Sequence, residues 1–408
     1  MTFEEAGKKL SGTGQEHLLR YYDELKENEK KILLEQIEDL DLELLKLAEN
    51  GTKETKRGKL EPLGAVTLEE IRKRKNHYEQ LGKKALRECK VGAVLLAGGQ
   101  GTRLGFDKPK GMLNVGVNKE LYLFEQLICN LMNVVDKVGA WIPLFIMTSE
   151  KNNEDTVAFF EEKNYFGYNK EYVFFFVQQM APSVSFDGKI YMEEKYRIST
   201  SPNGNGGWFL SLVNAGLLDK VEELGVEWLN VFAVDNVLQK IADPVFVGAV
   251  LENDCECGSK VVAKADPNER VGVLCLEDGK PSIVEYYEMT DEMIHSKDEN
   301  GNLLYNFGVI LNYLFRVDTL KRIMSENLPT HIVEKKIPYL DEEAKYVRPE
   351  KPNGYKFETL VLDMIHMMDN CLPFEVEREL EFAPIKNATG VDSLESAREL
   401  MRKNGIEI

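Results

Sequence analysis

Residues 91–115 have the sequence VGAVLLAGGQGTRLGFDKPKGMLNV, and this stretch decides the fold. It begins with an apolar run, residues 91–96, whose length and β-branched content predict a buried strand. A glycine cluster follows, together with the cations Arg103, Lys108 and Lys110. Glycines let backbone N–H groups approach a bound group closely, and successive N–H groups form a concave anion site. We therefore expect a phosphate-bearing ligand at the carboxyl end of this strand, the usual ligand position in an open α/β sheet.

Two common phosphate-loop patterns do not fit this loop. The dinucleotide pattern G-x-G-x-x-G fails from Gly99, because Leu104 stands where the third glycine should be. The Walker pattern fails because Met112 stands where it requires lysine. What remains is L-x-G-G-x-G-T-R-L, a spacer, and P-K-G at 109–111. This combination resembles the signature loop of nucleotidyltransferases that act on sugar phosphates.

The bulk composition narrows the class of protein. The 408 residues are 43% hydrophobic, which is ample for a large core, and carry a net charge of −18. Such an acidic surface disfavours nucleic-acid backbones and anionic membranes, so a bound polyphosphate would need local cations or a divalent metal. No run approaches the about 20 apolar residues of a membrane span. The six cysteines show no disulfide framework, and the N-terminus lacks a signal-like apolar segment, so we expect reduced thiols and a cytoplasmic location.

The order of patterns along the chain predicts three regions. Residues 1–88 favour a helical N-terminal region, with a polar linker at 49–64 and a helix over 67–89; a partner-binding arm is the alternative role. Residues 89–344 alternate between strands and helices, which indicates an α/β fold with a mostly parallel, Rossmann-like sheet. The expected strands are 91–97, 141–148, 173–179, 228–234 and 259–265. The expected helices are 121–138, 153–163, 207–217 and 244–253. Asp-Gly pairs at 187–188 and 278–279 predict hairpins, and 345–408 form a small C-terminal region.

Further candidate site residues lie outside the loop. Gly204 and Asn205 occur in NGNGG, directly before a helical pattern, where they could contact a base or ribose or simply form a turn. Asp235 ends a predicted strand, a suitable place for a Mg²⁺ ligand, although an aspartate there could equally cap a helix. No Ser/His/Asp pairing is visible, and nucleotidyl transfer depends on positioning and charge neutralisation more than on a covalent nucleophile.

Several segments together resemble the UDP-sugar pyrophosphorylase family, and within it the eukaryotic-type UDP-N-acetylglucosamine pyrophosphorylases. The resemblance runs from about residue 20 to 390. Its segments are LLAGGQGTRLG, PKG, FDGKIYMEEK, NGNGG, VDNVLQKIADPVFVG, KVVAK, PNERVGV, VEYYE, HIVEKKIPYLD, KPNGYKFE and EFAPIKNA. It implies a nucleotide-binding sheet like that of the GT-A glycosyltransferases, and a Mg²⁺-dependent reaction of UTP with a sugar 1-phosphate that yields a UDP-sugar and pyrophosphate.

The resemblance also implies residue roles. Arg103, Lys110 and Lys386 would be catalytic cations, and Asp235 would bind Mg²⁺. The nucleotide would be bound by Leu96, Ala97, Gly98, Gly99, Gly101, Thr102, Gln178, Gly204 and Asn205. The sugar would be bound by Gly272, Glu285 and Asn306. A monomer or weak homo-oligomer is expected, with no nucleic-acid partner and no membrane.

The sequence departs from the family near the sugar site. The N-acetylglucosamine enzymes usually have NxGN where this chain has NFGV from Asn306, and aromatic residues where it has Leu360 and Leu362. N-acetylglucosamine 1-phosphate is the expected substrate, with glucose or galactose 1-phosphate as alternatives. A non-catalytic UDP-sugar-binding module and a nicotinamide-dependent oxidoreductase are the competing classes, and the failed dinucleotide pattern speaks against the second.

Overall fold

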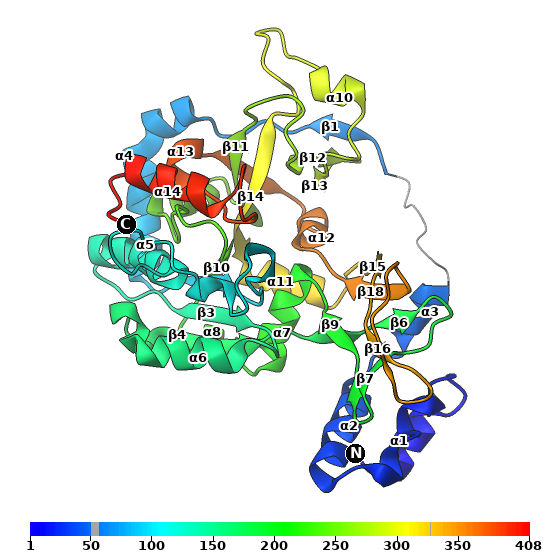
Figure 1. The fold of residues 1–408 in the computed structure, drawn as a ribbon. Coiled ribbons are helices and arrows are strands. Elements are labelled where there is room, and N and C mark those ends of the chain that lie inside the picture. The colour runs from blue at the N-terminus through cyan, green and yellow to red at the C-terminus, as the bar shows by residue number, and fades with distance from the viewer. Residues whose placement is uncertain (50–56, 327) are drawn as a thin grey trace. The chain divides into compact units, whose positions relative to one another are not determined.

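The computed structural model describes residues 1–49, 57–326 and 328–408 of the chain (Figure 1). Its contacts define two compact units. The smaller unit combines Met1–Lys56, Gln179–Gly207 and Leu328–Val361, and the larger unit combines Arg57–Gln178, Trp208–Asn327 and Leu362–Ile408. Each unit joins segments that are distant in sequence, so the three regions bounded at residues 88 and 344 stay a prediction.

The larger unit is built on a mixed sheet. Its strands are β1 (Leu60–Pro62), β2 (Val91–Leu96), β3 (Leu144–Thr148), β4 (Val173–Val177), β10 (Trp228–Ala233), β11 (Cys257–Ala263), β12 (Val273–Glu277), β13 (Lys280–Val284), β14 (Phe307–Arg316) and β19 (Cys371–Glu375). β10, β2, β3 and β4 are neighbours and parallel, and the register pairs Val231 with Val94 and Val94 with Phe145. β14 continues the sheet antiparallel to β10 and leads to β11 and β12. The predicted α/β class with a mostly parallel central sheet is confirmed.

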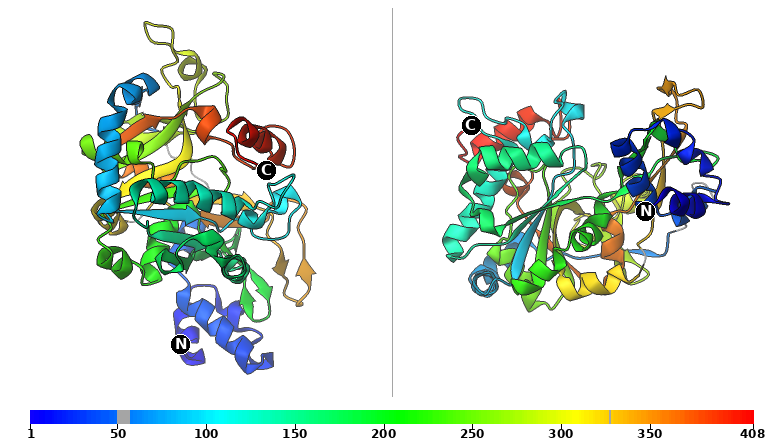
Figure 2. Two further views of the ribbon diagram at one scale, coloured as in Figure 1. Left: turned by 90° about the vertical axis from the view of Figure 1, so that its left-hand side faces the viewer. Right: turned by 90° about the horizontal axis from the view of Figure 1, so that it is seen from below.

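Helices cover both faces of this sheet (Figures 1 and 2). The larger unit contains α4 (Leu68–Arg87), α5 (Leu123–Val138), α6 (Asn153–Glu162), α7 (Trp208–Asn214), α8 (Leu218–Glu223), α9 (Pro244–Glu252), α10 (Asp291–His295), α11 (Val317–Met324), α13 (Arg378–Glu381) and α14 (Leu394–Lys403), while α12 (Val361–His366) begins at the boundary between the units. Ala93 and Leu95 share one core with Leu127 of α5. Trp208 of α7 packs against Phe315, whose neighbour Leu314 belongs to that first core, so α7 covers the opposite face.

The elements expected between residues 91 and 265 are all present. The bounds shift by a few residues; for example, β3 begins at Leu144 rather than at residue 141. The Asp278-Gly279 hairpin joins β12 and β13 through two residues with positive φ, 50° and 82°, as expected of a tight turn that follows the strand twist.

Part of the predicted linker is wrong. Residues 60–62 form β1, an edge strand antiparallel to β12, and residues 50–56 lie outside the described part. A three-residue strand that contains Pro62 offers no alternating apolar pattern, so its pairing with a distant strand leaves no local signal.

The smaller unit holds the N-terminal helices and several short strands. The elements are α1 (Phe3–Leu10), α2 (Glu27–Asp39), α3 (Glu43–Glu49), β5 (Met180–Pro182), β6 (Val184–Ser185), β7 (Met192–Glu194), β8 (Arg197–Ile198), β9 (Thr200–Pro202), β15 (His331–Lys335), β16 (Tyr339–Leu340), β17 (Tyr346–Val347) and β18 (Gly354–Glu358). The apolar residues Leu33 and Ile37 of α2 are fully buried. They belong to one core with Ile198 and Phe357, so strands from later segments complete the helical part. None of the described helices combines the length and the apolar character that crossing a membrane requires.

Candidate active site

The glycine loop follows β2 and folds back on itself. Gly101 donates its N–H to the carbonyl of Lys108 at 3.0 Å, and Lys110 donates its N–H to the carbonyl of Gly99 at 3.1 Å. A Cβ added at Gly101 would lie 2.7 Å from the backbone oxygen of Phe106, so this position admits no larger residue without a shift of the backbone. The fold of the loop thereby places the lysine of the P-K-G segment beside the glycines, as the sequence pattern suggested.

Two polar residues from neighbouring strand ends flank the loop. Asn152 is fully buried, donates to the carbonyl of Ala97 at 2.9 Å, and accepts from the N–H of Ser149 at 2.7 Å. The Oε1 atom of Gln178 lies 3.0 Å from the position that a Cβ on Gly98 would take. The structure thus brings the predicted residue Gln178 to the loop. Asn152 was missed, and the only available signal was an asparagine just after a predicted strand.

Four charged groups gather where β2 and β10 end. The ammonium group of Lys110 is 3.8 Å from the carboxylate of Asp235, and both side chains are mostly buried. Burial lowers the pKa of Lys110, the charge of Asp235 opposes this, and the positive charges of Lys386 and Arg103 lower the pKa further. Lys110 therefore lies within electrostatic reach of the two other proposed cations and of Asp235. Excess positive charge of this kind favours a polyanionic ligand.

Lys386 is placed by pairing of the backbone. The segment before it runs antiparallel to the residues that follow β10, with Asn236 opposite Pro384. The N–H of Ile385 donates to the carbonyl of Asp235 at 2.9 Å. Lys386, which is 151 residues after Asp235 in sequence, therefore directly follows a residue that is hydrogen-bonded to the candidate metal ligand.

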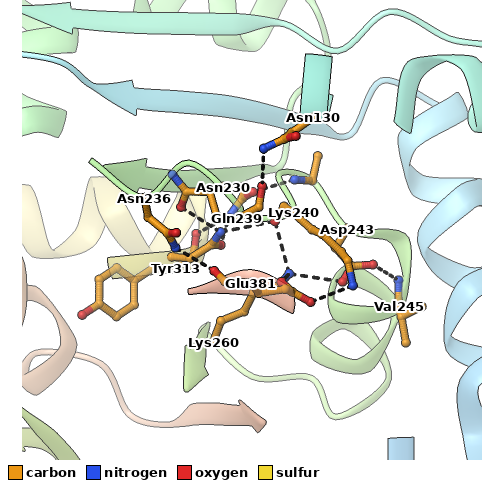
Figure 3. A network of polar contacts seen from close by, with 12 residues as sticks. Asn130, Asn230, Asn236, Gln239, Lys240, Asp243, Val245, Lys260, Tyr313 and Glu381 are labelled. Atoms are coloured by element: carbon orange, nitrogen blue, oxygen red, sulfur yellow. Dashed lines mark hydrogen bonds and ion pairs between the residues drawn. The ribbon is translucent and has the colours of Figure 1, made fainter. Parts of the chain in front are cut away.

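A buried polar network lies next to this pairing (Figure 3). The ammonium group of Lys260, with no exposed surface, contacts Glu381 at 2.6 Å and Asp243 at 3.2 Å. Burial alone would lower the pKa of Lys260, but the two carboxylates outweigh it and raise the pKa. Burial likewise opposes the charge of Asp243, and the ammonium groups of Lys260 and Lys240 keep its pKa below the ordinary value. The sequence analysis assigned no role to this cluster, since its members come from separate segments.

The three predicted sugar contacts lie directly beside the ends of neighbouring strands. Gly272 precedes β12, Glu285 follows β13, and Asn306 precedes β14, while Val273 pairs with both Val284 and Gly308. A Cβ on Gly272 would lie 3.2 Å from the carboxylate of Glu285. Burial, together with the charge of Glu288, raises the pKa of Glu285, whereas Lys386 lowers it. The electrostatic influence of Lys386 links this group to the charged cluster.

Gly204 and Asn205 belong to the smaller unit. Their loop is bound to the segment that begins α12: the N–H of Gly206 donates to the carbonyl of Thr359, and the N–H of Val361 donates to Oδ1 of Asn205 at 3.0 Å. Gly204 has φ +88°, and a Cβ there would lie 2.1 Å from the carbonyl oxygen of Thr359. Asn205 therefore has a structural partner, and its contact with uridine stays a prediction.

The residues present fit a magnesium ion of the kind that nucleotide enzymes use. Among the residues that the structure describes, no group of three or more His, Cys, Asp or Glu side chains is arranged to hold a metal. Mg²⁺ is commonly bound by one or two carboxylates together with substrate phosphates and water, rather than by a protein cage. Asp235, partly exposed and paired with Lys110, is suited to supply that single carboxylate.

Comparison with known proteins adds independent evidence. The family model described as UTP–glucose-1-phosphate uridylyltransferase matches residues 43–404. The UDP-N-acetylhexosamine pyrophosphorylase-like protein 1 of Homo sapiens is 38% identical over 408 residues, which cover 94% of this chain and 80% of that protein. The UDP-N-acetylglucosamine pyrophosphorylase of Saccharomyces cerevisiae is 36% identical over 396 residues, with 93% and 82% covered.

A solved structure agrees with these relatives. The crystal structure of the uridine diphosphate N-acetylglucosamine pyrophosphorylase from Trypanosoma brucei, in complex with an inhibitor, superposes with a TM-score of 0.85 at 28% identity, covering 98% of this chain and 84% of that one. With the glycine loop, the cation cluster and Asp235 in place, the chain belongs to the UTP–glucose-1-phosphate uridylyltransferase family.

Proposed function

We propose that the protein transfers the uridylyl group of UTP to a sugar 1-phosphate, with N-acetylglucosamine 1-phosphate as the sugar substrate. The observation that carries the proposal is the gathering of Arg103, Lys386 and Asp235 around Lys110, in a glycine loop at the carboxyl end of β2. The names of the yeast and trypanosome relatives support N-acetylglucosamine as the sugar. The sequence departures near Asn306 and Leu360 keep glucose and galactose 1-phosphate as alternatives.

The chemistry is an in-line displacement at phosphorus. A phosphate oxygen of the sugar 1-phosphate attacks the α-phosphorus of UTP, the bond to the β-phosphate oxygen breaks, and pyrophosphate leaves. Arg103 and Lys110 would bind phosphate oxygens and stabilise the charge that develops on the transferring group. Lys386, near both Asp235 and Glu285, would bind the phosphate of the sugar. No covalent nucleophile is required, which agrees with the absence of a nucleophile–base pair in the sequence.

Asp235 would hold Mg²⁺ together with the phosphates. When bound, the ion supplies positive charge and orients the triphosphate. The backbone groups of residues 96–102 and the amide of Gln178 would bind the nucleotide, and Gly204 and Asn205 would contact uracil and ribose. Gly272, Glu285 and Asn306 would bind the sugar. We further propose a cytoplasmic monomer or weak homo-oligomer, a setting in which the six cysteines remain the free thiols that the structure contains.

The direct test is product identification. The protein is incubated with UTP, Mg²⁺ and N-acetylglucosamine 1-phosphate, and the expected products are UDP-N-acetylglucosamine and pyrophosphate in equal amounts. The reverse reaction, from UDP-N-acetylglucosamine and pyrophosphate, should regenerate UTP. Tight binding of UDP-N-acetylglucosamine without turnover in either direction would contradict the proposal and favour a binding module.

A further inference from the structure

Asn236, the residue after the candidate metal ligand, forms hydrogen bonds with the segment that leads to Lys386. Its side chain is 1% exposed. Its Nδ2 group donates to the carbonyl of Glu381 at 2.7 Å, and its Oδ1 atom accepts from the N–H of Ala383 at 2.9 Å. Figure 3 shows the side chain of Asn236 pointing toward Glu381. One amide thus satisfies a backbone acceptor and a backbone donor on the same short segment.

The backbone pairing beside it is short. Among the residues that the structure describes, two backbone hydrogen bonds flank the pair of Asn236 and Pro384: Ile385 N–H to the Asp235 carbonyl at 2.9 Å, and Val237 N–H to the Ala383 carbonyl at 3.4 Å. The second bond is long for an N–H···O bond. The Asn236 side chain adds two hydrogen bonds to these two, and the bond to the Glu381 carbonyl, at 2.7 Å, is the shortest of the four.

The buried ion cluster contacts the same segment. Lys260 directs its ammonium group to three acceptors: Glu381, Asp243 and the carbonyl of Lys240 at 3.2 Å. An ammonium group has three N–H donors, so these three acceptors satisfy it. Asp243 and Lys240 lie on the chain that follows β10, and Glu381 lies on the segment before Lys386. Lys260 therefore connects the same two segments as Asn236: the one that follows β10 and the one that precedes Lys386.

We propose that Asn236 is a positioning residue that fixes Lys386 relative to Asp235, with the Lys260 cluster anchoring the segment on which it acts. The inference rests on the proposed function, in which Asp235 and Lys386 bind parts of the same phosphate assembly. An asparagine suits this position because it presents one donor and one acceptor together. An aspartate would set a carboxylate oxygen against the carbonyl of Glu381, and an alanine would leave both backbone groups without these partners.

The test compares two buried asparagines of the same region. Asn230, also 1% exposed, makes three comparable hydrogen bonds, to Asn312, to the carbonyl of Tyr313 and from the N–H of Ala242, but none to residues 381–386. Asn230→Ala is thus the matched control for Asn236→Ala. The corresponding serine variants replace any alanine variant that is insoluble. Urea unfolding of each protein measures the loss of stability that the two variants share.

The expected result distinguishes an effect on the position of Lys386 from a general loss of folding stability. Asn236→Ala should lower kcat about 10- to 100-fold and weaken Mn²⁺ binding in the presence of UTP, measured by electron paramagnetic resonance, by a similar factor. Asn230→Ala should leave both within about threefold while losing a comparable amount of stability. In a Lys386→Ala background, Asn236→Ala should cost little further activity, because coupled residues show non-additive effects.

Three outcomes would overturn the inference. These are equal activity losses in the two asparagine variants, unchanged Mn²⁺·UTP affinity in Asn236→Ala, and full additivity with Lys386→Ala. A wild-type protein without turnover would instead count against the proposed function. The Mn²⁺·UTP affinities of wild type and variants would then still decide whether Asn236 positions the site.

Discussion

Lys110 occupies an environment that is costly for a cation without a ligand. Its ammonium group is mostly buried, a single carboxylate faces it, and two further cations lie near enough to lower its pKa. Bound triphosphate would supply the missing negative charge. The same reasoning applies more weakly to Arg103, which is exposed.

Lys110→Ala should therefore lower kcat by about 100-fold or more, the scale for removing one donor that stabilises a developing oxyanion. Initial rates of pyrophosphate release at saturating substrates measure this. Lys119→Ala is the control, since Lys119 is half-exposed and pairs only loosely, at 3.7 Å, with Glu407. Near-normal turnover of Lys110→Ala would remove Lys110 from the catalytic group.

Glu285 should impose a pH dependence on sugar binding. Burial and the charge of Glu288 raise its pKa above the ordinary 4.5. As the pH falls through this raised pKa, the carboxylate becomes protonated and loses an acceptor for sugar hydroxyls. KM for the sugar 1-phosphate should therefore rise on the acid side, beginning above the pH range of an ordinary glutamate, while KM for UTP changes less.

Glu285→Gln separates this effect from titration of the substrate phosphate, whose own second pKa is about 6. In the variant, KM for the sugar 1-phosphate should no longer show the pH dependence that comes from Glu285. The pH dependence that comes from the substrate phosphate should remain. Identical profiles for wild type and variant would show that Glu285 does not act through its charge.

The site residues predicted from the sequence are those whose signal is local. The glycine loop, Lys110 and Asp235 each sit in a recognisable motif at a strand end, and the structure brings them together with Gln178. Asn152, Asn236 and Lys260 carried no such signal. Their roles depend on hydrogen bonds to segments 55, 145 and 121 residues away.

At the scale of elements, the buried Lys260 cluster joins β11, the chain after β10 and helix α13. Removal of the lysine would leave Glu381 and Asp243 charged and buried without their shared partner. Such a loss is strongly destabilising even where the intact ion pair adds little.

Lys260→Met should therefore lower the free energy of unfolding by about 3–5 kcal/mol in urea titrations. Lys240→Met is the matched control, because Lys240 also contacts Glu381, at 3.1 Å, but is 53% exposed. Its loss should cost no more than about 1 kcal/mol. Equal losses of unfolding free energy for the two variants would show that burial of Lys260 does not determine its contribution to stability.

The central parallel strands β2 and β3 were predictable because they are buried on both faces. Every residue of β2 and β3 is buried, and a continuous apolar run of this length is easily recognised. β1 and the short strands of the smaller unit gave no such pattern. Strands of two or three residues are too short to show alternation, and the local sequence around β1 does not encode its distant partner β12.

At the scale of the whole molecule, the net charge of −18 opposes the binding of UTP. The local cations must offset this repulsion, and a divalent ion on Asp235 would add to them. Removal of divalent cations with EDTA should therefore abolish turnover, and added Mg²⁺ or Mn²⁺ should restore it. Undiminished turnover in EDTA would contradict the role proposed for Asp235.

The measurement that tests the central claim most directly is pyrophosphate release from UTP and Mg²⁺ with a panel of sugar 1-phosphates. The panel contains N-acetylglucosamine, N-acetylgalactosamine, glucose and galactose 1-phosphate, each tested with wild type and with Asp235→Ala. We expect turnover by wild type, fastest with N-acetylglucosamine 1-phosphate, and a large loss in the variant. No release with any sugar, despite measurable UTP binding, would contradict a uridylyltransferase.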